Sequence, residues 1–372
     1  MLISIGDDNI KKGIGLMKKK RKKSRRKKRV LFLLAEIVIL AVLLAVGYVI
    51  LKYDKFQVTS FDEGDIKVNE GANQEGYTTV ALFGGDSREG QLEEGTHADC
   101  IIVATIDNQT KEVKMVSVYR DTLTEQMNGE IKKANNAYFT GGPQDAINML
   151  NKNLDLDIQN YVTVDFKALA DTVDLLGGIE VDIKEEEVQY MNEFLEETAQ
   201  VAGKEAKFIE HSGNQLLDGS QAVTYARIRS TAGGDYTRTE RQRLVLEKIF
   251  DKVLHTKLGT INKIIDEVFP QVSTSFSLKN LIGLAADATQ YQLGEAKGFP
   301  FELTDGNVDG VGSSVIPLGF AENVQELHEF LYPKDEYTVS EKVKEIASEI
   351  ETLTGYTRAD YTESAQDTEN QE

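Results

Sequence analysis

An unbroken apolar segment near the amino terminus limits this chain more than any other feature. Residues 30–50 form a run of 21 residues with one charged side chain, Glu36. About 20 apolar residues are enough to cross the hydrocarbon core of a bilayer. One ionised carboxyl at depth costs roughly 3 kcal/mol, which the surrounding aliphatic side chains outweigh. The segment 30–51 is therefore predicted to be a single transmembrane helix.

The basic run KKKRKKSRRKKR, residues 18–29, directly precedes this segment and sets its orientation. Lys and Arg beside a spanning helix stay on the cytoplasmic side, so the carboxyl-terminal part is predicted to lie outside the cell. A nucleic-acid-binding patch is one alternative for the run, and a cleaved signal peptide is another for the whole segment. The apolar stretch is longer than that of a signal peptide, and no small-residue cleavage site follows it cleanly. We therefore predict an uncleaved anchor with a cytoplasmic tail at 1–29.

Charge divides the chain at the same place. Residues 1–29 carry 13 Lys and Arg and 2 Asp and Glu, a net charge of +11. The remaining 343 residues carry 29 basic and 59 acidic side chains, a net charge of −30, which argues against nucleic acid as a partner. An anionic substrate would need a local basic pocket or a bound cation. Cys100 is the only cysteine, which excludes an intramolecular disulfide and a cysteine-rich metal site.

The exported part alternates strand-like and helix-like segments. We predict a polar stalk at 52–76, a domain at 77–335, and at 336–372 a last helix followed by an acidic disordered tail. Strands are expected at 78–85, 99–107, 112–121, 161–166 and 179–183, and helices at 141–154, 167–178, 219–227, 237–254 and 340–353. Such alternation predicts an α/β fold in which a central mixed sheet is flanked by helices. The region 265–335 gives no elements that can be assigned.

Charged side chains collect where the expected strands begin and end. Asp86 and Arg88 follow the first strand, Asp99 opens the second, and Arg120 and Asp121 close the third. Sites in α/β sheets tend to form at strand ends, although such residues also cap and solvate loops. Asp86 and Asp99 are candidates to hold a divalent cation together with substrate phosphates.

A group of arginines indicates a functional site more strongly than the charged residues at the strand ends do. Arg227 and Arg229 end one expected helix, while Arg238, Arg241 and Gln242 share a face of the next. The first turn of a helix normally favours Asp and Glu, so several arginines there suggest a bound anion. Helix amino termini and arginine side chains together bind phosphate or pyrophosphate well; a solvated basic face is the alternative. The residues therefore predict a phosphate-handling pocket outside the membrane.

Seven blocks of the chain resemble the LytR–CpsA–Psr family, in order and with similar spacing, over about residues 77–260. They read LFGGDSR, HADCIIVATID, VSVYRDT, KANNAYFTGGPQDAINMLNKNL, YVTVDFKALADTVDLLGGIEVDI, LLDGSQAVTYARIR and GGDYTRTERQRLV. The resemblance implies a cell-wall transferase of Gram-positive-type bacteria. Such an enzyme moves an anionic glycopolymer, for example teichoic acid or capsule polysaccharide, from a polyprenyl-pyrophosphate carrier in the membrane lipid onto peptidoglycan through a phosphodiester bond. A hydrophobic groove for the polyprenyl chain is implied as well.

The same resemblance implies roles for particular residues. It places a magnesium ion, or manganese instead, on Asp86 and Asp99, and catalytic roles on Arg120, Asp121 and Arg229. Its pyrophosphate-binding positions fall on Arg88, Arg120, Arg227, Arg229, Arg238, Arg241 and Gln242. His97 stands where the family usually has arginine, and Tyr119 where it has proline. His97 is either an ordinary loop histidine or a residue that alters pH dependence or substrate preference.

Three other functions stay open on the sequence. A pyrophosphate-lipid phosphatase would differ only in using water as the acceptor. A non-catalytic module would bind the same lipid-linked glycan, and both predicted metal aspartates and the arginine set argue against it. A transcription attenuator would use the basic tail on DNA, whereas the position of that tail beside the apolar segment favours membrane topology.

Overall fold

The structure is a computed structural model of the 372-residue chain. It describes residues 47, 49–59, 61, 62, 64–72, 74–85, 92, 95–229, 231 and 233–360. The contacts divide the chain into Met1–Asp54 and Lys55–Glu372, and the second unit, called the domain below, is treated by itself. The predicted cytoplasmic tail and nearly all of the predicted transmembrane helix lie outside the described residues. No helix within the described ranges is both long and apolar enough for a membrane span.

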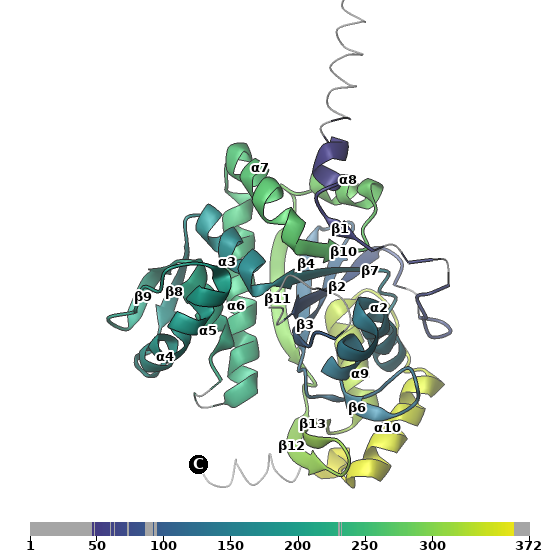
Figure 1. The fold of residues 1–372 in the computed structure, drawn as a ribbon. Coiled ribbons are helices and arrows are strands. Elements are labelled where there is room, and N and C mark those ends of the chain that lie inside the picture. The colour runs from purple at the N-terminus through teal and green to yellow at the C-terminus, as the bar shows by residue number, and fades with distance from the viewer. Residues whose placement is uncertain are drawn as a thin grey trace, which may run out of the picture. The chain divides into compact units, whose positions relative to one another are not determined.

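A seven-stranded mixed sheet forms the centre of the domain (Figure 1). Its strands lie in the order β1–β10–β7–β2–β3–β4–β11. The three antiparallel neighbours at its centre are β2 (Tyr77–Gly85), β3 (Ala98–Asp107) and β4 (Glu112–Val118). The other members are β1 (Gln57–Val58), β7 (Asn160–Asp165), β10 (Val272–Thr274) and β11 (Gln292–Phe299). The central mixed sheet expected from the sequence is confirmed.

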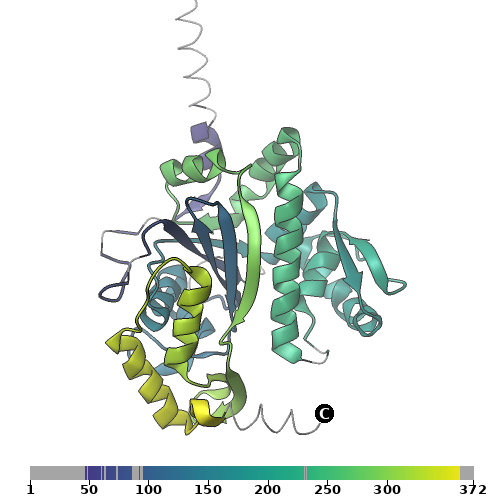
Figure 2. The same cartoon turned by 180° about the vertical axis from the view of Figure 1, so that it is seen from behind.

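Helices cover both faces of this sheet, as Figures 1 and 2 show. Alternate side chains of a strand point to opposite faces. Ile101 and Val103 of β3 accordingly pack into the main core with α2, α9 and α10, whereas Ile102 packs against Leu246 of α6 on the other face. The helices are α2 (Asn135–Leu154), α3 (Phe166–Leu175), α4 (Glu185–Ala202), α5 (Gly219–Arg227), α6 (Gly234–Leu254), α7 (Leu258–Glu267), α8 (Leu278–Ala286), α9 (Phe320–Leu331) and α10 (Glu341–Thr354).

Capping side chains fix where the helices beside the site begin. The Asp218 carboxylate accepts the backbone N–H of Gln221 at the start of α5, and the Gln221 side chain accepts the backbone N–H of Asp218 in return. Asp165 accepts the N–H of Ala168 at 2.7 Å at the start of α3. After α3 the chain turns at Gly178, whose φ is 88° and whose Cβ, if present, would lie 2.7 Å from a backbone oxygen. Glycine is therefore required there.

The helix expected at 141–154 is the second part of a longer element. α2 is interrupted at Gly141 and Gly142, and Gly142 has a φ of 63°. Pro143 follows in the first turn of the second part, where its missing N–H is tolerated. The first part begins at Asn135 and Asn136, which the candidate site uses.

The region 265–335, which the sequence does not resolve into elements, completes the sheet and adds a hairpin. β11 pairs in parallel with β4 and forms one edge. β12 (Leu303–Val308) and β13 (Gly312–Pro317) form an antiparallel pair. Two further pairs are β5 (Leu123–Glu125) with β6 (Ile131–Lys133), and β8 (Ile179–Ile183) with β9 (Gly213–Leu217).

The segment between residues 55 and 72, part of the predicted stalk, contacts the domain along α2. Phe61 and Ile66 pack against the main core. The backbone N–H of Lys67 donates to the Asn148 side chain at 2.6 Å. These contacts tie the polar segment to the helix.

Candidate functional site

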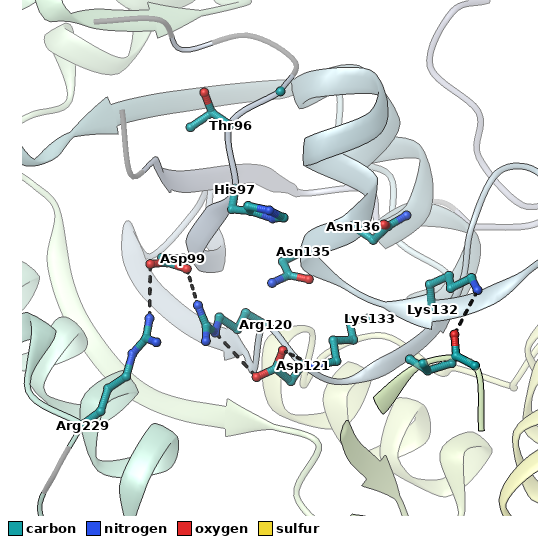
Figure 3. Close-up of a pocket in the computed structure, with 13 residues that line it drawn as sticks. Thr96, His97, Asp99, Arg120, Asp121, Lys132, Lys133, Asn135, Asn136 and Arg229 are labelled. Carbon is teal, nitrogen blue, oxygen red and sulfur yellow. Dashed lines mark hydrogen bonds and ion pairs between the residues drawn. The ribbon is translucent and has the colours of Figure 1, made fainter. Parts of the chain in front are cut away.

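Asp99, near the start of β3, lies between two arginines. Its Oδ1 accepts a hydrogen bond from Nη1 of Arg120 at 2.5 Å, and its Oδ2 accepts one from Nη2 of Arg229 at 3.3 Å (Figure 3). Arg120 follows β4 by two residues, and Arg229 follows α5 by two. Because β3 and β4 are antiparallel, the start of one lies beside the end of the other. The structure thus brings together three of the residues that the sequence singles out.

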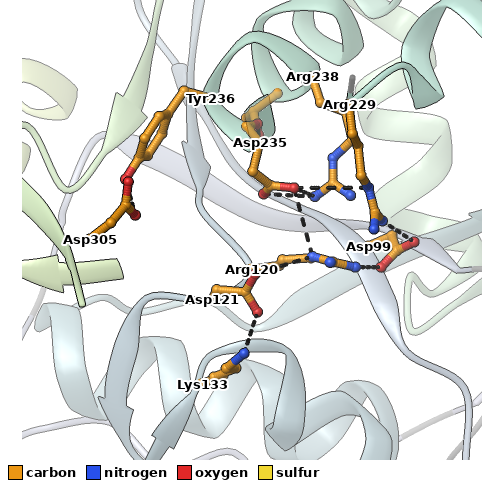
Figure 4. Close-up of polar contacts among 10 residues, drawn as sticks. Asp99, Arg120, Asp121, Lys133, Arg229, Asp235, Tyr236, Arg238 and Asp305 are labelled. Atoms are coloured by element: carbon orange, nitrogen blue, oxygen red, sulfur yellow. Dashed lines mark hydrogen bonds and ion pairs between the residues drawn. The ribbon is translucent and has the colours of Figure 1, made fainter. Parts of the chain in front are cut away.

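Asp235, in the first turn of α6, is a second carboxylate among the arginines, and it was not predicted from the sequence. Its Oδ1 lies 2.7 Å from Nη2 of Arg238, 3.9 Å from Nε of Arg120 and 4.0 Å from Nε of Arg229 (Figure 4). The sequence pattern that could have indicated Asp235 is its spacing of three residues from Arg238 at the start of a helix, where the two side chains lie on one face. Asp99 and Asp235 together hold three mutually repelling arginines in one place.

Arg238 is buried and has unused hydrogen-bond donors. Its side chain is 2% exposed, and no group of the described residues forms a hydrogen bond with its Nε or Nη1. Burial lowers the pKa of Arg238 to about 10; Asp235 opposes this, and Arg229 and Arg120 add to it. The guanidinium is therefore still charged at neutral pH. Buried donors without partners cost about 1–3 kcal/mol each, so these two nitrogens indicate a place for an anion.

Asp121 links Arg120 to a lysine. Its Oδ2 lies 3.6 Å from Nε of Arg120, and its Oδ1 lies 3.2 Å from Nζ of Lys133. Burial alone would lower the pKa of Arg120, but Asp99 and Asp121 outweigh burial and raise it. Asp121 therefore keeps both cations in position at the floor of the site.

Arg227 and Gln242 line the same part of the site as Arg229. The Arg227 guanidinium lies over the ring of Phe166, 4.7 Å from its centroid, and donates to the Thr198 hydroxyl at 3.1 Å. Gln242 lies one turn after Arg238 on α6 and lines the same cavity. Two other predicted site residues, Asp86 and Arg88, fall outside the described residues.

Arg241 is held in a buried ion pair and does not line the site. Its Nε donates to Oε1 of Glu187 at 2.8 Å, and both side chains are 2% exposed. Its other two nitrogens donate to the carbonyl of Ile228 and the hydroxyl of Thr231. These contacts join α6 to α4 and to the loop after α5, which is a structural role.

Three cavities with common lining residues run from apolar to polar surroundings. The apolar cavity, about 220 Å³, shares Phe166 and Gln242 with an arginine cavity of about 330 Å³. The arginine cavity shares Asp99 and Arg229 with a polar cavity of about 660 Å³. The apolar cavity lies between the sheet and α3, α5 and α6, and its lining includes Leu82, Cys100, Ile102, Val162, Val164, Leu169, Val223, Ala226, Val245 and Leu246.

The polar cavity is lined by side chains that the sequence did not single out, apart from His97 and the residues around Asp99. Lys132 and Lys133 come from β6, and Asn135 and Asn136 from the start of α2 (Figure 3). His97 stacks on Phe139 with ring centroids 4.4 Å apart. A cavity with amide, lysine and imidazole groups suits a hydroxyl-rich ligand.

The described residues do not by themselves form a metal site. Within the described ranges, no three His, Cys, Asp or Glu side chains are grouped to hold a metal ion. Asp99 has both carboxylate oxygens on arginines, and the other predicted ligand, Asp86, is not described. A cation would need Asp99 to be released from its arginines first.

An α/β domain in which an apolar cavity leads into an arginine-lined one is a domain that can bind an amphiphile with an anionic head group. The family model of the LytR_cpsA_psr family matches residues 48–318. The chain belongs to this family.

Several known proteins resemble the chain. The polyisoprenyl-teichoic acid–peptidoglycan teichoic acid transferase TagU of Enterococcus faecalis is 30% identical over 218 residues, 58% of this chain and 66% of that protein. The matches to this and two further transferases span 66%, 47% and 57% of those proteins. The solved structure of a transcriptional regulator from Enterococcus faecalis has a TM-score of 0.59 at 24% identity and covers 78% of this chain and 99% of its own. The Bacillus subtilis LytR-CPS2A-psr family protein YwtF (TagT) with bound octaprenyl pyrophosphate lipid has a TM-score of 0.50 at 21% identity, with coverages of 80% and 99%. The two solved structures show the fold.

Proposed function

We propose that this protein transfers an anionic glycopolymer from a polyprenyl-pyrophosphate carrier onto peptidoglycan and forms a phosphodiester bond. The observation that carries the proposal is the sharing of Phe166 and Gln242 between the apolar cavity and the arginine cavity. An isoprenoid chain suits the first cavity and a pyrophosphate the second. The names of the relatives support this reading, since TagU is named a teichoic acid transferase and YwtF was solved with an octaprenyl pyrophosphate lipid.

The arginines bind pyrophosphate by changing partners. Phosphate oxygens supply the missing acceptors of Arg238 and compete with Asp99 for Arg229, whose side chain is 46% exposed. Charge-assisted bonds from guanidinium to phosphate are among the stronger hydrogen bonds. Because these donors are already in place, they also stabilise the charge that develops on phosphate in the transition state.

Transfer then needs an acceptor hydroxyl beside the bound phosphates. The hydroxyl oxygen attacks the phosphorus that carries the glycopolymer, and the bond from this phosphorus to the oxygen of polyprenyl phosphate breaks. Polyprenyl phosphate leaves with the electron pair, and the hydroxyl proton passes to solvent or to a side chain. The polar cavity adjoins Asp99 and Arg229 and provides room for the glycans. Asp121 contributes by holding Arg120 and Lys133 toward the phosphates.

We further propose that Asp86 and Asp99 hold Mg²⁺, or Mn²⁺, once pyrophosphate has drawn the arginines away from Asp99. Mg²⁺ in proteins is commonly held by one or two carboxylates together with substrate phosphates, whose charge it neutralises. Removing divalent cations with EDTA should lower the transfer rate by at least about ten-fold, and Mg²⁺ should restore it. Asp99→Asn should give the same loss without restoration. A rate that EDTA leaves unchanged would contradict this part of the proposal.

We also propose the cellular location that the basic run and the apolar segment of the sequence predict. The tail at 1–29 is cytoplasmic, residues 30–51 span the membrane once, and the domain lies outside the cell. Anchoring of this kind raises the effective concentration of a lipid-linked donor.

The test is a transfer reaction with the full-length protein in nanodiscs. A polyprenyl-pyrophosphate-linked oligosaccharide and a peptidoglycan oligomer are supplied, and products are followed by mass spectrometry. We expect a phosphodiester-linked conjugate, lost with Arg229→Ala and kept with Arg358→Ala, which removes a surface arginine paired with Glu302. Release of sugar phosphate without a conjugate would assign a phosphatase instead. Tight lipid binding without turnover would leave a binding module.

A further inference from the structure

Two helices near the sheet edge formed by β1 and β10 expose apolar side chains. Every residue of α7 and α8 is described, and none of them is fully buried. Leu258 at the start of α7 is 86% exposed, and Ile282 on the outer side of α8 is 50% exposed. α8 reads LKNLIGLAA, so its solvent side carries few groups that water would solvate well. An exposed helix of this composition normally has a partner.

Both helices lie at the end of the domain where the chain comes from the predicted anchor. α8 begins four residues after β10, which pairs with β1, and Lys55 forms an ion pair with Asp266 of α7 at 2.9 Å. Figures 1 and 2 show α7, α8 and β1 at one end of the domain and α10 at the other. Lys55 is only four residues after position 51, where the predicted span ends, and four extended residues reach about 14 Å. The end of the predicted span is thus joined to this end of the domain by at most about 14 Å of chain.

The apolar cavity extends toward the same end. Along α6 its lining passes from Gln242, at the arginine cavity, to Leu246, one turn nearer to α7. Val162 and Val164 of β7 line the cavity and also pack in one cluster with Ile264 of α7. α7 thus packs against the wall of the cavity that is to receive a membrane lipid.

We propose that α7 and α8 form a membrane-contacting edge that lies on the bilayer surface and guides the isoprenoid chain into the apolar cavity. Leu258 and Ile282 insert at the boundary between head groups and acyl chains, as apolar faces of interfacial helices do. Exposed lysines at 257, 263 and 279 give this end cations for anionic lipid head groups, although residues 30–372 as a whole carry a net charge of −30. The guiding role rests on the proposed function, whereas the bilayer contact requires only the anchor.

The chain contains no tryptophan, so single substitutions report on one position each. Full-length Leu258→Trp and Ile282→Trp are placed in nanodiscs of phosphatidylcholine and phosphatidylglycerol with brominated acyl chains. We expect blue-shifted emission that bromine quenches by about two-fold or more, because these positions lie in the acyl boundary. The matched control is Leu353→Trp, on α10 at the opposite end and 43% exposed; its emission should not be quenched. All three sites are exposed, so the fold should tolerate them, and a thermal unfolding curve checks this. Emission at 258 and 282 like that of the control would overturn the proposal.

A rate comparison then tests guiding separately from chemistry. The double variant Leu258→Asp, Ile282→Asp is assayed with a long-chain donor in the bilayer and with a short-chain donor that is soluble in water. Transfer from the bilayer donor should fall about ten-fold, while the soluble donor should react at the wild-type rate, because the arginine site is unchanged. Equal losses with both donors would contradict guiding. If the wild type transfers neither donor, the proposed function fails, and the quenching result still decides the bilayer contact.

Discussion

At the scale of residues, the site is organised by two carboxylates, Asp99 and Asp235, that pair with the arginines proposed to bind phosphate. Asp235 pairs with Nη2 of Arg238, while Nε and Nη1 of Arg238 have no hydrogen-bond partner within the part of the chain that the structure describes. An anion that enters the cavity must compete with the Asp235 carboxylate for Nη2 of Arg238. It can accept hydrogen bonds from Nε and Nη1 without such competition. Asp235 therefore sets the affinity of the arginine cavity.

Asp235→Asn tests this role. It keeps a hydrogen-bond acceptor for Arg238 and removes one negative charge, so the affinity for inorganic pyrophosphate should rise by about five-fold, or ~1 kcal/mol. Calorimetric titration of the full-length protein measures it, with Asp305→Asn as a control carboxylate that pairs with the Tyr236 hydroxyl instead of an arginine. Weaker binding in Asp235→Asn than in the control would show that Asp235 serves to order Arg238.

His328 gives the domain a sensitivity to acid. Burial lowers the pKa of His328 below its ordinary value of 6.5, although its hydrogen bond to the carbonyl of Leu154 opposes the shift. The ring also stacks on Tyr337 at a centroid distance of 3.5 Å. The unfolded chain therefore binds the proton more readily than the folded one, and the stability present above pH 6.5 is lost as the pH falls below it.

The expected result is a fall in the free energy of unfolding between pH 7 and pH 5, by at most about 1.4 kcal/mol per pH unit from this one group. His328→Gln should have lower stability at pH 7 and a shallower pH dependence. His255→Gln is the matched control, since His255 is 76% exposed and should leave the slope unchanged. Denaturation curves of the full-length protein measure all three, and equal slopes in wild type and His328→Gln would contradict the assignment.

At the scale of elements, α6 shows how far the sequence could predict the site. Its position and its arginines follow from the sequence, but the assumption of one shared face was too simple. At 3.6 residues per turn, Arg241 and Gln242 point about 100° apart, on either side of Arg238. Gln242 therefore faces the cavity, and Arg241 faces Glu187 of α4, a helix that was not predicted from the sequence. No local sequence pattern shows which side of α6 faces the cavity and which side faces α4.

The buried pair between α4 and α6 predicts a loss of stability in Arg241→Ala. Removing one partner leaves Glu187 buried without a counter-charge, which costs about 3–5 kcal/mol. Affinity for pyrophosphate should stay within about two-fold, because Arg241 does not line the cavity. The double variant Glu187→Leu, Arg241→Met should regain most of the stability. Thermal unfolding measures the loss of stability, and calorimetry measures the affinity for pyrophosphate. Weaker pyrophosphate binding with an unchanged unfolding temperature would show that Arg241 belongs to the binding site.

At the scale of the whole molecule, part of the sheet and part of the site form only through contacts between residues that are distant in the sequence. The strands β2, β3 and β4 were predictable because both of their faces are buried and they read as apolar runs between turn residues. β11 reads QLGEAKGF, with two glycines and no alternation, and becomes a strand by pairing with β4 about 180 residues earlier. The polar cavity likewise joins β6, α2 and the turn between β12 and β13, so its lining could not be predicted from one stretch of chain.

The central claim is that one continuous site holds an isoprenoid chain in the apolar cavity and its pyrophosphate on the arginines. Photolabelling tests this claim most directly. The full-length protein in nanodiscs is irradiated with a polyprenyl pyrophosphate whose chain carries a diazirine, and labelled peptides are identified by mass spectrometry. We expect labels on the cavity wall around Val162, Phe166 and Leu246, and a strong reduction of labelling by excess inorganic pyrophosphate or by Arg229→Ala. Labels elsewhere in the domain, or labelling that pyrophosphate does not reduce, would contradict it.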